Sequence, residues 1–329
     1  MSATLRDALA THRPELLRHC YRMLGSFEDA EDLVQESLAR AWTGRKSFAG
    51  RGPLRHWLYR IATHTCLNAL KRKRRLAMPQ LDHRAAPAGG ALDEPLDPAH
   101  WVAPAPDDRL FARGAAEAAE EREGVAIAFV ALLQRLPPRQ RAVLLLKDVV
   151  GWPADENRRG AGISLPAVSS GLHRARKTLA AGRSRAPAAE PPPEVVREYI
   201  RCWEARDLFG LVALLRKDVV FAMPPWRTWF RGQTAVRWFL QTPRFTAFWS
   251  SGLRVLPTRA NGQLALAFFV RSPAGAYLRH SIELPRFQGA RLAEVTTFVG
   301  AAYLRSFQVP ERIEGPRKSG EQFAAGRLS

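Results

Sequence analysis

Apolar residues recur at intervals of three and four in two stretches near the start of the chain, and each stretch predicts an amphipathic helix. The first stretch covers residues 28–42, where Ala30, Val34 and Leu38 fall on one face. Ser26 precedes it with a hydroxyl group suited to an N-cap, and Asp29 follows three residues later, an arrangement close to a capping box. The opposite face is mostly acidic and carries Glu28, Asp29, Glu31, Asp32, Gln35 and Glu36.

This acidic face has two explanations that fit the residues about equally well. Acidic side chains in the first turns of a helix are stabilised by the helix dipole. A concentrated acidic face in a protein of net charge +19 is also suited to docking a basic partner. The pattern alone leaves both explanations open.

The second stretch, residues 54–72, places Leu54, Leu58 and Ile61 on its inner face. Aromatic, hydroxyl, amide and basic side chains share the other face, a mixture that suits stacking on unpaired bases and neutralising phosphates. A solvated helix end is the plainer alternative. The candidate nucleic-acid contacts on this face and in the basic run that follows are Tyr59, Arg60, Thr63, His64, Asn68, Lys71, Arg72 and Arg74.

Helical periodicity returns in residues 125–136, 138–150 and 164–179, with prolines at the junction of the first two. The last of these predicted helices has small polar residues at its start and cations further along, which suits a recognition helix in the major groove. Many surface helices look similar, so the signal is weak by itself. The outward side chains are Ser164, Ser169, Ser170, His173, Arg174 and Lys177.

Residues 154–161 would supply the supporting helix of such a helix-turn-helix motif. Asn157, Arg159 and Gly160 stand where apolar residues usually pack beneath the recognition helix. A glycine inside a helix costs about 1 kcal/mol relative to alanine. The sequence therefore predicts a loosened supporting helix.

The periodicity also predicts where the domains begin and end. Residues 79–109 are rich in Pro, Ala, Gly and Asp without a regular period, which predicts a flexible linker on which Trp101 docks against a surface. A second proline-rich linker covers 184–193, and the tail covers 310–329. Between them lie helical domains at 1–78 and 110–183. Residues 194–309 combine a helix with alternating strands and an Asn261-Gly262 hairpin turn, which predicts an α+β domain.

Composition narrows the class of protein further. No apolar run reaches the roughly 18 residues of a membrane span, and the N-terminus lacks the apolar core of a secretory signal, so we expect a cytoplasmic protein without membrane contact. Cys20, Cys66 and Cys202 fit neither a disulfide framework nor a metal site and are expected as buried apolar side chains. The charge of +19 favours a polyanionic partner, although an Arg-rich composition alone would also produce it.

Two segments carry a resemblance to a known family. DAEDLVQESLARAW, followed by GPLRHWLYRIATHTCLNALKRKRR, closely resembles region 2 of extracytoplasmic-function (ECF) sigma factors over about residues 10–76. LPPRQRAVLLLKDVVGW, with SLPAVSSGLHRARKTL, resembles region 4 of the same family. The resemblance implies a cytoplasmic, non-enzymatic transcription factor that carries bacterial RNA polymerase to promoter DNA. It implies that the two helical domains are sigma region 2 and the helix-turn-helix of region 4.

The resemblance also assigns roles to residues, and it favours the docking explanation of the acidic face. Core RNA polymerase, through its β′ clamp helices and β flap, and promoter DNA are the implied partners. The implied polymerase contacts are Asp29, Glu31, Asp32, Gln35 and Glu36. The helix at 54–72 and its preceding loop would melt and capture the −10 element, and the helix at 164–179 would contact the −35 element. Whether an anti-sigma partner exists stays open.

Residues 192–308 resemble the SnoaL-like (ketosteroid-isomerase-like) cone fold, on the segments D-V-x-F-x-M-P-P and W-F-R-G. Such a fused domain modulates sigma activity in cis in some members of the family. Trp229, Phe230 and His280 are the candidate lining of a ligand pocket, without a metal or other cofactor. The alternative is a repurposed fusion whose cone domain binds or converts a small molecule. The predicted fold is multidomain: two all-α domains followed by an α+β cone domain.

Overall fold

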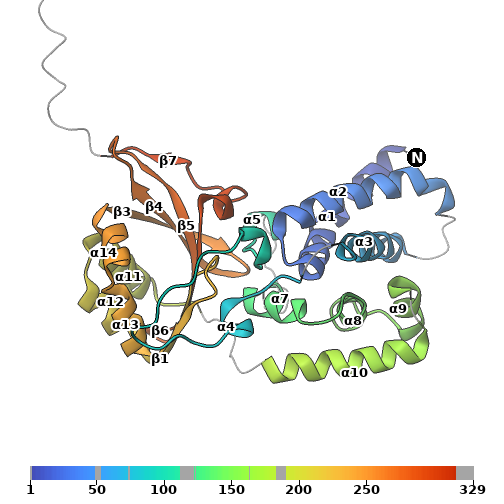
Figure 1. Ribbon diagram of the computed structural model, residues 1–329. Coiled ribbons are helices and arrows are strands. Elements are labelled where there is room, and N and C mark those ends of the chain that lie inside the picture. Colours follow the sequence, from blue (N-terminus) through green and yellow to red (C-terminus); the bar gives the residue numbers. More distant parts are fainter. Residues whose placement is uncertain are drawn as a thin grey trace, which may run out of the picture.

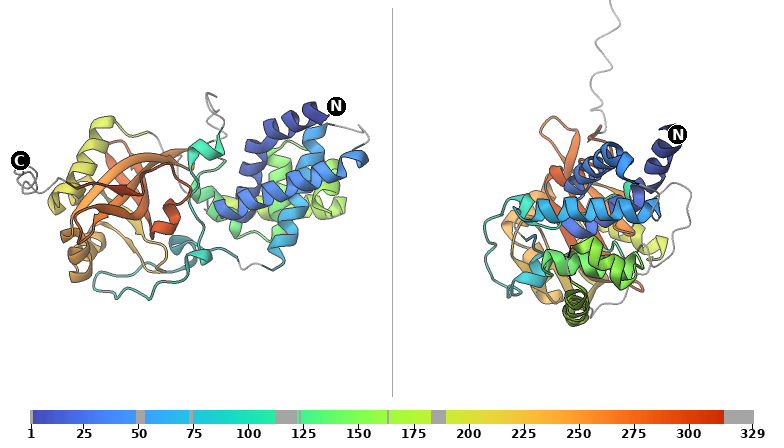
Figure 2. Two further views of the ribbon diagram at one scale, coloured as in Figure 1. Left: turned by 90° about the horizontal axis from the view of Figure 1, so that it is seen from above. Right: turned by 90° about the vertical axis from the view of Figure 1, so that its right-hand side faces the viewer.

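The computed structural model describes residues 2–48, 53–72, 75–111, 122, 124–162, 164–182 and 190–315. A helical half and a sheet half lie side by side, and the first and second groups of helices stack on each other in the helical half (Figure 1). Seen from above, the two halves also lie side by side (Figure 2, left). The predicted combination of two helical units with an α+β unit is confirmed.

The first group of helices packs around an apolar centre that includes Leu16, Leu17, Val34 and Ala62, all essentially unexposed. The hydroxyl of Ser26 accepts a hydrogen bond from the Asp29 backbone N–H at 3.3 Å, which confirms the predicted N-cap. Cys20 and Cys66 are buried in the same core as free thiols, as expected. The helices are α1 (Ser2–Leu24), α2 (Phe27–Thr43) and α3 (Leu54–Leu70), with a 3-10 turn at Gly44–Ser47 after α2.

The second group of helices follows the predicted periodicity. Pro138 occupies the first turn of its helix, where a missing N–H costs nothing. A π-helical turn at Leu145–Val149 continues that helix toward the supporting helix. The helices are α7 (Ile127–Gln134), α8 (Pro138–Leu144), α9 (Ala154–Ala161) and α10 (Leu165–Gly182).

A curved sheet of seven strands forms the C-terminal half, in the order β2-β1-β6-β5-β4-β3, with β7 added beside β5. Neighbouring strands are antiparallel except β1 and β6, which are parallel. Helix α11 packs on β3, and α13 packs on β1 and β2. This arrangement of helices on a curved sheet is the one expected of the SnoaL-like cone. Asn261 and Gly262 form the predicted hairpin turn between β3 and β4.

The bounds of these elements follow from the hydrogen bonding. The helices are α11 (Pro193–Ala205), α12 (Leu208–Leu214), α13 (Gln233–Leu240) and α14 (Pro243–Ser250), and a 3-10 turn covers Ala301–Leu304. The strands are β1 (Leu215–Ala222), β2 (Trp229–Arg231), β3 (Leu253–Ala260), β4 (Gln263–Arg271), β5 (Tyr277–Gln288), β6 (Arg291–Val299) and β7 (Arg312–Ile313).

The segment 79–109, predicted as a flexible linker, is instead docked along most of its length, and it crosses the sheet half before it returns to the helices (Figure 1). The Ala86 N–H donates to Trp229 O, and the Leu96 N–H donates to Pro225 O. Trp101 is buried, as expected of that side chain. The prediction of flexibility is wrong because composition indicates only that the segment has no regular structure of its own. Hydrogen-bond partners elsewhere in the chain hold the segment in place. Short helical turns lie in or at the end of the segment, at α4 (Pro79–Asp82), Pro98–His100 and α5 (Asp107–Leu110).

Candidate functional site

The acidic face of α2 is open over its middle turns. Asp32, Gln35 and Glu36 are exposed, and Asp29 is partly exposed. Glu36 pairs with Arg40 one turn further on, at 2.6 Å. This pair is exposed, so solvent screens it and it contributes little to stability. The face therefore remains available to a basic partner.

Glu31 differs from the other acidic residues of α2. Its carboxylate pairs with Arg13 of α1 at 3.3 Å and with Arg109 of α5. Only 18% of its side-chain surface is exposed to solvent. Glu31 thus fixes α2 against α1 and the docked segment, and a partner at this face reaches it less easily than its neighbours.

Helix α3 presents a stripe of polar side chains with spacings of three and four, as its periodicity predicts. These side chains project to solvent and could meet an anionic ligand together. Arg74 lies outside the described residues. The exposed members of the predicted set are Arg60, His64, Asn68, Lys71 and Arg72.

Tyr59 and Thr63 are not on this exposed stripe, and their assignment to the outward face is wrong. Thr63 is fully buried, with its hydroxyl 2.9 Å from Nε2 of His19. The Tyr59 hydroxyl donates to Glu15 at 3.2 Å, and its ring packs against His19 and Trp152. The reason is that α3 is covered on two sides, by α1 and α2 within its own unit and by the second group of helices. Burial also lowers the pKa of His19 to about 3, so this ring is neutral in the core.

The second group of helices lies directly against α3. Trp152, between α8 and α9, packs its ring on His56 and Tyr59 of α3. Nδ1 of His56 lies 2.5 Å from a carboxylate oxygen of Glu156 in α9. The first and second groups of helices are therefore in contact through the side of α3 next to its exposed stripe.

A buried polar group joins the same two units at the end of α1. The Arg141 guanidinium donates to Met23 O, to Leu136 O at 3.1 Å and to the side chain of Gln134. The Gln134 amide in turn donates to Arg22 O at 3.2 Å. Burial lowers the pKa of Arg141 to about 10, which leaves it charged at neutral pH. Separating the units would expose these groups to water, where they find replacement partners.

Helix α10 is open on the side that faces away from α1–α3 (Figure 1). Its inner side is closed by Val168, Ala175 and Leu179. Arg176 pairs with Asp148 at 2.6 Å. The six predicted contacts are all exposed: Ser164, Ser169, Ser170, His173, Arg174 and Lys177.

The supporting helix α9 is complete, so the expectation of a loosened helix is wrong. Asn157 is buried, and its side-chain N–H donates to Val143 O at 2.8 Å. This hydrogen bond replaces the apolar packing that is usual at this position. Gly160 lies against Trp152 and Leu146, and a methyl group there would overlap the Trp152 ring. The glycine makes room for the tryptophan that covers α3. Arg159 is exposed and pairs with Asp155.

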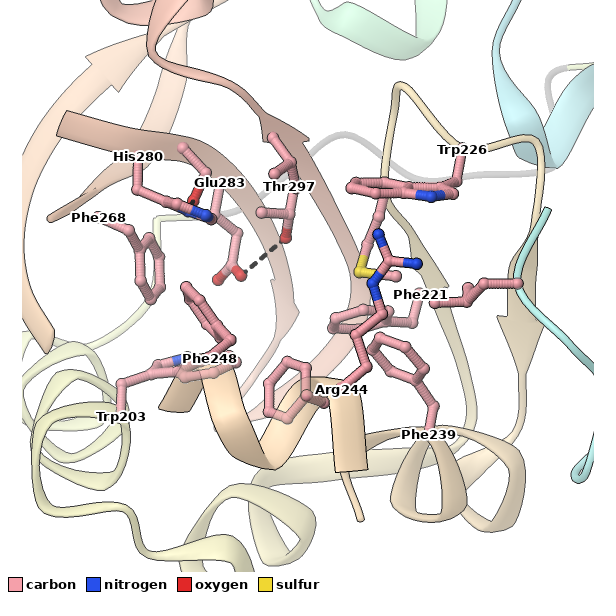
Figure 3. A pocket seen from close by; sticks show the side chains of 15 residues that line it. Trp203, Phe221, Trp226, Phe239, Arg244, Phe248, Phe268, His280, Glu283 and Thr297 are labelled. Atoms are coloured by element: carbon pink, nitrogen blue, oxygen red, sulfur yellow. Dashed lines mark hydrogen bonds between the residues drawn. The ribbon is translucent and has the colours of Figure 1, made fainter. Parts of the chain in front are cut away.

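An aromatic cavity of about 220 Å³ opens between the helices and the sheet of the C-terminal half. His280 lines it, as predicted, and burial lowers the pKa of this ring to about 4, so it is neutral at pH 7. Glu283 lies deeper. Burial raises its pKa to about 7, although the hydrogen bonds that it accepts from Tyr199 and Thr297 act to lower the pKa. Figure 3 shows both side chains directed into the space between the sheet and Phe248.

Trp229 and Phe230 do not line this cavity, so placing them there is wrong. Phe230 is fully buried and stacks on Phe239 with ring centroids 5.0 Å apart, which puts it in the core. Trp229 points to the other face of β2 and donates its indole N–H to His83 O at 3.0 Å. Alternation along a strand predicts such a split, since consecutive residues face opposite sides. The sequence interpretation also missed Leu92 and Arg244, which line the cavity from other elements.

Neither a metal cluster nor a membrane-spanning helix is found within the described ranges. No group of three or more His, Cys, Asp or Glu side chains among these residues is placed to hold a metal ion. Of the helices described, none combines the length and apolarity that crossing a bilayer requires.

Comparison with known proteins agrees with the two helical units. Residues 9–76 match the family model of Sigma-70 region 2, and residues 126–179 match that of Sigma-70, region 4. The chain is 38% identical over 309 residues to the ECF RNA polymerase sigma factor SigG of Mycobacterium tuberculosis, which covers 92% of this chain and 83% of SigG. It is 28% identical over 281 residues to the probable ECF RNA polymerase sigma factor SigI of the same species, covering 84% and 88% of the two chains.

The fold also has a solved counterpart that includes the sheet half. The crystal structure of the Mycobacterium tuberculosis extracytoplasmic function sigma factor SigJ superposes with a TM-score of 0.59 at 20% identity. The match covers 94% of this chain and 100% of that one, so the helical and sheet halves occur together in both. The chain contains regions 2 and 4 in the family's order, and it is similar to SigG over nearly its whole length. It therefore belongs to the ECF RNA polymerase sigma factors, which direct bacterial RNA polymerase to promoters.

Proposed function

We propose that the exposed acidic face of α2 binds the β′ clamp helices of core polymerase. Asp32, Gln35 and Glu36 form its accessible centre, with Asp29 beside them. Glu31 acts behind this face by holding α2 in place through Arg13 and Arg109. An acidic surface on a chain of net charge +19 supports specific docking, since the remaining surface repels a basic partner.

The two helices α3 and α10 contact the promoter in this proposal, with α10 also beside the β flap. The α3 stripe from Arg60 to Arg72 neutralises phosphates and meets the melted −10 strand. The six exposed side chains of Ser164 and α10 face the −35 major groove, supported by a complete α9. The protein acts in the cytoplasm and performs no catalysis itself.

Both promoter elements cannot be contacted at once in the arrangement described here. Positions −10 and −35 are about 25 base pairs apart, or roughly 85 Å at about 3.4 Å per step. Region 4 instead packs on α3 through Trp152 and Glu156. The segment 79–109 has about 30 residues and spans roughly 100 Å when fully extended. Opening therefore requires that this segment leaves the sheet half.

The docked segment is the single observation that carries a role in cis for the C-terminal domain. That domain holds the segment through Trp229 O, Thr228 and Pro225 O. It also holds the helices through Asn261, whose side chain donates to the Tyr21 hydroxyl and to Val125 O, each at 2.7 Å. Asn261 also accepts from the Ala105 N–H at 3.0 Å. The domain thereby stabilises the closed arrangement and lowers the activity of the free protein.

Run-off transcription with core polymerase tests this proposal on the full chain. Asn261→Gly tolerates the positive φ of 56° while it removes every side-chain hydrogen bond. Asn261→Asp keeps the acceptor for Ala105 but loses the two donated bonds and places a buried carboxylate oxygen against Val125 O. Losing buried hydrogen bonds of about 1–3 kcal/mol shifts the equilibrium toward the open form by roughly tenfold. We expect more transcript from both variants than from the native chain. Equal transcript from all three contradicts control in cis.

A further inference from the structure

The cavity in the C-terminal half is built for an aromatic guest. Seven aromatic side chains contribute to its lining, among them Trp203, Phe239, Phe248 and Phe268. The cavity has a volume of about 220 Å³, and an apolar protein cavity of about 150 Å³ already accepts benzene. A molecule of one or two fused rings therefore fits this space and stacks against the lining.

Glu283 provides a polar end to this apolar space. Its carboxylate accepts hydrogen bonds from the Tyr199 hydroxyl at 2.7 Å and from the Thr297 hydroxyl at 3.0 Å. A carboxylate accepts about four hydrogen bonds, so positions remain for a donor that enters from the cavity. Glu283 itself is 1% exposed, and a carboxylate so deeply buried favours a ligand donor over bulk water. The chemistry selects a hydroxyl or amino group.

The opposite end of the cavity is its rim. The guanidinium of Arg244, on α14, lies over the ring of Trp226 at 5.2 Å from the centroid. Figure 3 shows this pair on the side away from His280 and Glu283. The ring system of a guest thus lies between a buried acceptor and an exposed cation.

One wall of the cavity belongs to the docked segment rather than to the cone. Leu92 lines the cavity and packs against the core of the sheet half. The next residue, Asp93, donates its N–H to the Thr228 hydroxyl at 2.9 Å and accepts from that hydroxyl at 3.0 Å. A guest in the cavity therefore touches the segment that joins regions 2 and 4.

We propose that this cavity binds a one- or two-ring aromatic molecule that presents a hydroxyl or amino donor to Glu283, and that the bound molecule strengthens the docking of segment 79–109. The Leu92 wall completes the site only while the segment is docked, so the ligand binds that state more tightly. A ligand shifts an equilibrium toward the state that it binds better. The binding site stands by itself, whereas its effect on transcription rests on the control in cis proposed above.

The site is tested with 2-naphthol and the full-length chain, by calorimetry and by quenching of the tryptophan fluorescence. At about pH 8, above the pKa of about 7 that burial gives Glu283, the change Glu283→Gln keeps the shape of the side chain and replaces a charged acceptor by a neutral one. We expect this variant to weaken 2-naphthol binding about tenfold, while naphthalene, which has no donor, binds both proteins alike. No binding of 2-naphthol at about 1 mM, or equal loss for the two probes, overturns the site.

Hydrogen exchange tests the coupling without polymerase or DNA. The N–H groups of Ala86, Asp93 and Leu96 all donate to the cone domain, so their exchange reports docking of the segment. We expect saturating 2-naphthol to slow their exchange in the native chain. Leu92→Ala should abolish this ligand-induced protection, whereas Leu96→Ala, the same change in the same segment but outside the cavity lining, should retain it. Unchanged exchange on binding, or equal behaviour of the two variants, overturns the coupling.

Transcription then separates the two proposals. With binding and protection established, 2-naphthol should lower run-off transcription by the native chain and leave the Leu92→Ala variant unaffected. Protection without any change in transcript would leave the site and its coupling in place and contradict control in cis. If 2-naphthol does not bind but Asn261→Gly still raises transcription, control in cis stands and the ligand site is contradicted.

Discussion

Helices α3 and α10 are the two proposed promoter-contacting elements, and the structure covers them to different extents. The six predicted contacts of α10 are all exposed. On α3, Arg60, His64 and Asn68 are exposed, while Tyr59 lies beneath Trp152 of region 4. The recognition helix is thus open in the free protein, and the helix proposed to capture melted DNA is partly closed.

This difference separates two steps of promoter use. Binding of double-stranded DNA through cations on α10 needs no rearrangement of the described residues. Contact of melted DNA along α3 beside Tyr59 requires region 4 to leave. Under the proposed roles, a free molecule associates with DNA through its basic surface before it is able to hold a melted strand. The predictions that follow disturb the cover on α3 and use α10 as the reference.

The largest effect is expected from Gly160→Val, which puts a side chain where the Trp152 ring lies. Overpacking of this kind costs about 1–3 kcal/mol, and here the strain pushes Trp152 off α3. Thermal unfolding should show the loss of stability, and small-angle scattering should show a larger radius of gyration. Gly171→Ala on α10 is the matched control, because its nearest contact would be at 4.0 Å and helix propensity improves by up to about 1 kcal/mol. An unchanged radius in Gly160→Val would show that Trp152 does not hold the units together.

A smaller effect is expected from placing a second carboxylate opposite Glu156, at the position of His56. His56→Glu places two carboxylates together across the contact of α3 with α9, where 2.5 Å now separates the ring and the carboxylate. The pair is partly exposed, so we expect the closed form to be destabilised relative to the open form by about 1 kcal/mol. The radius of gyration at low salt measures it.

The same substitution on the open helix supplies the control for this added carboxylate. His173→Glu makes an equal change of charge on α10 and should leave the radius unchanged. The effect of His56→Glu should fade at about 1 M salt, where charges are screened within about 3 Å. A radius that stays large at high salt would mean that lost packing, and not repulsion, opens the protein.

The covered side of α3 is also where prediction from sequence reached its limit. Periodicity gave the helices and the acidic face, because an apolar stripe indicates which side of a helix faces its own core. It could not anticipate that a second unit packs on another side, so Tyr59 was placed outward. Thr63 was misplaced for a related reason, since a buried hydroxyl becomes acceptable only with a partner such as His19, 44 residues away.

Region 4 and the cavity show the same limit. Gly160 counted as a weakness by helix propensity, whereas its lack of a side chain admits Trp152. Leu92 lies in a segment whose composition predicts flexibility, and its place in the cavity depends on hydrogen bonds to Thr228 and neighbouring carbonyls. Strand alternation groups His280 with Ile282 and Leu284, which pack in the core on the other side of β5, and His280 reaches the cavity only because the register of β5 on β4 shifts beside it. Alternation also could not decide between Trp229 and Phe230 without the register of β2.

The smallest expected effect concerns pH and the buried side of α3. Burial alone would raise the pKa of Glu15, but hydrogen bonds from Arg55 and His12, with their charges, outweigh it and hold the pKa below its usual 4.5. A carboxylate with a lowered folded-state pKa stabilises the fold at pH values above 4.5, and that contribution is lost as the pH falls through the folded value. Because Glu15 also accepts from Tyr59, acid should loosen α3 before α10.

Glu15→Gln tests this sign directly. The variant should be less stable than the native chain at pH 7, by up to about 1 kcal/mol for a partly exposed set of charged hydrogen bonds. The difference should shrink as the pH falls below 4.5, because the native carboxylate then protonates as well. Denaturant unfolding at a series of pH values measures it, and Glu194→Gln, an exposed carboxylate in the other half of the molecule, is the reference. A difference between Glu15→Gln and the native chain that grows on acidification would reverse the sign and remove Glu15 from the forces that hold Tyr59 in place.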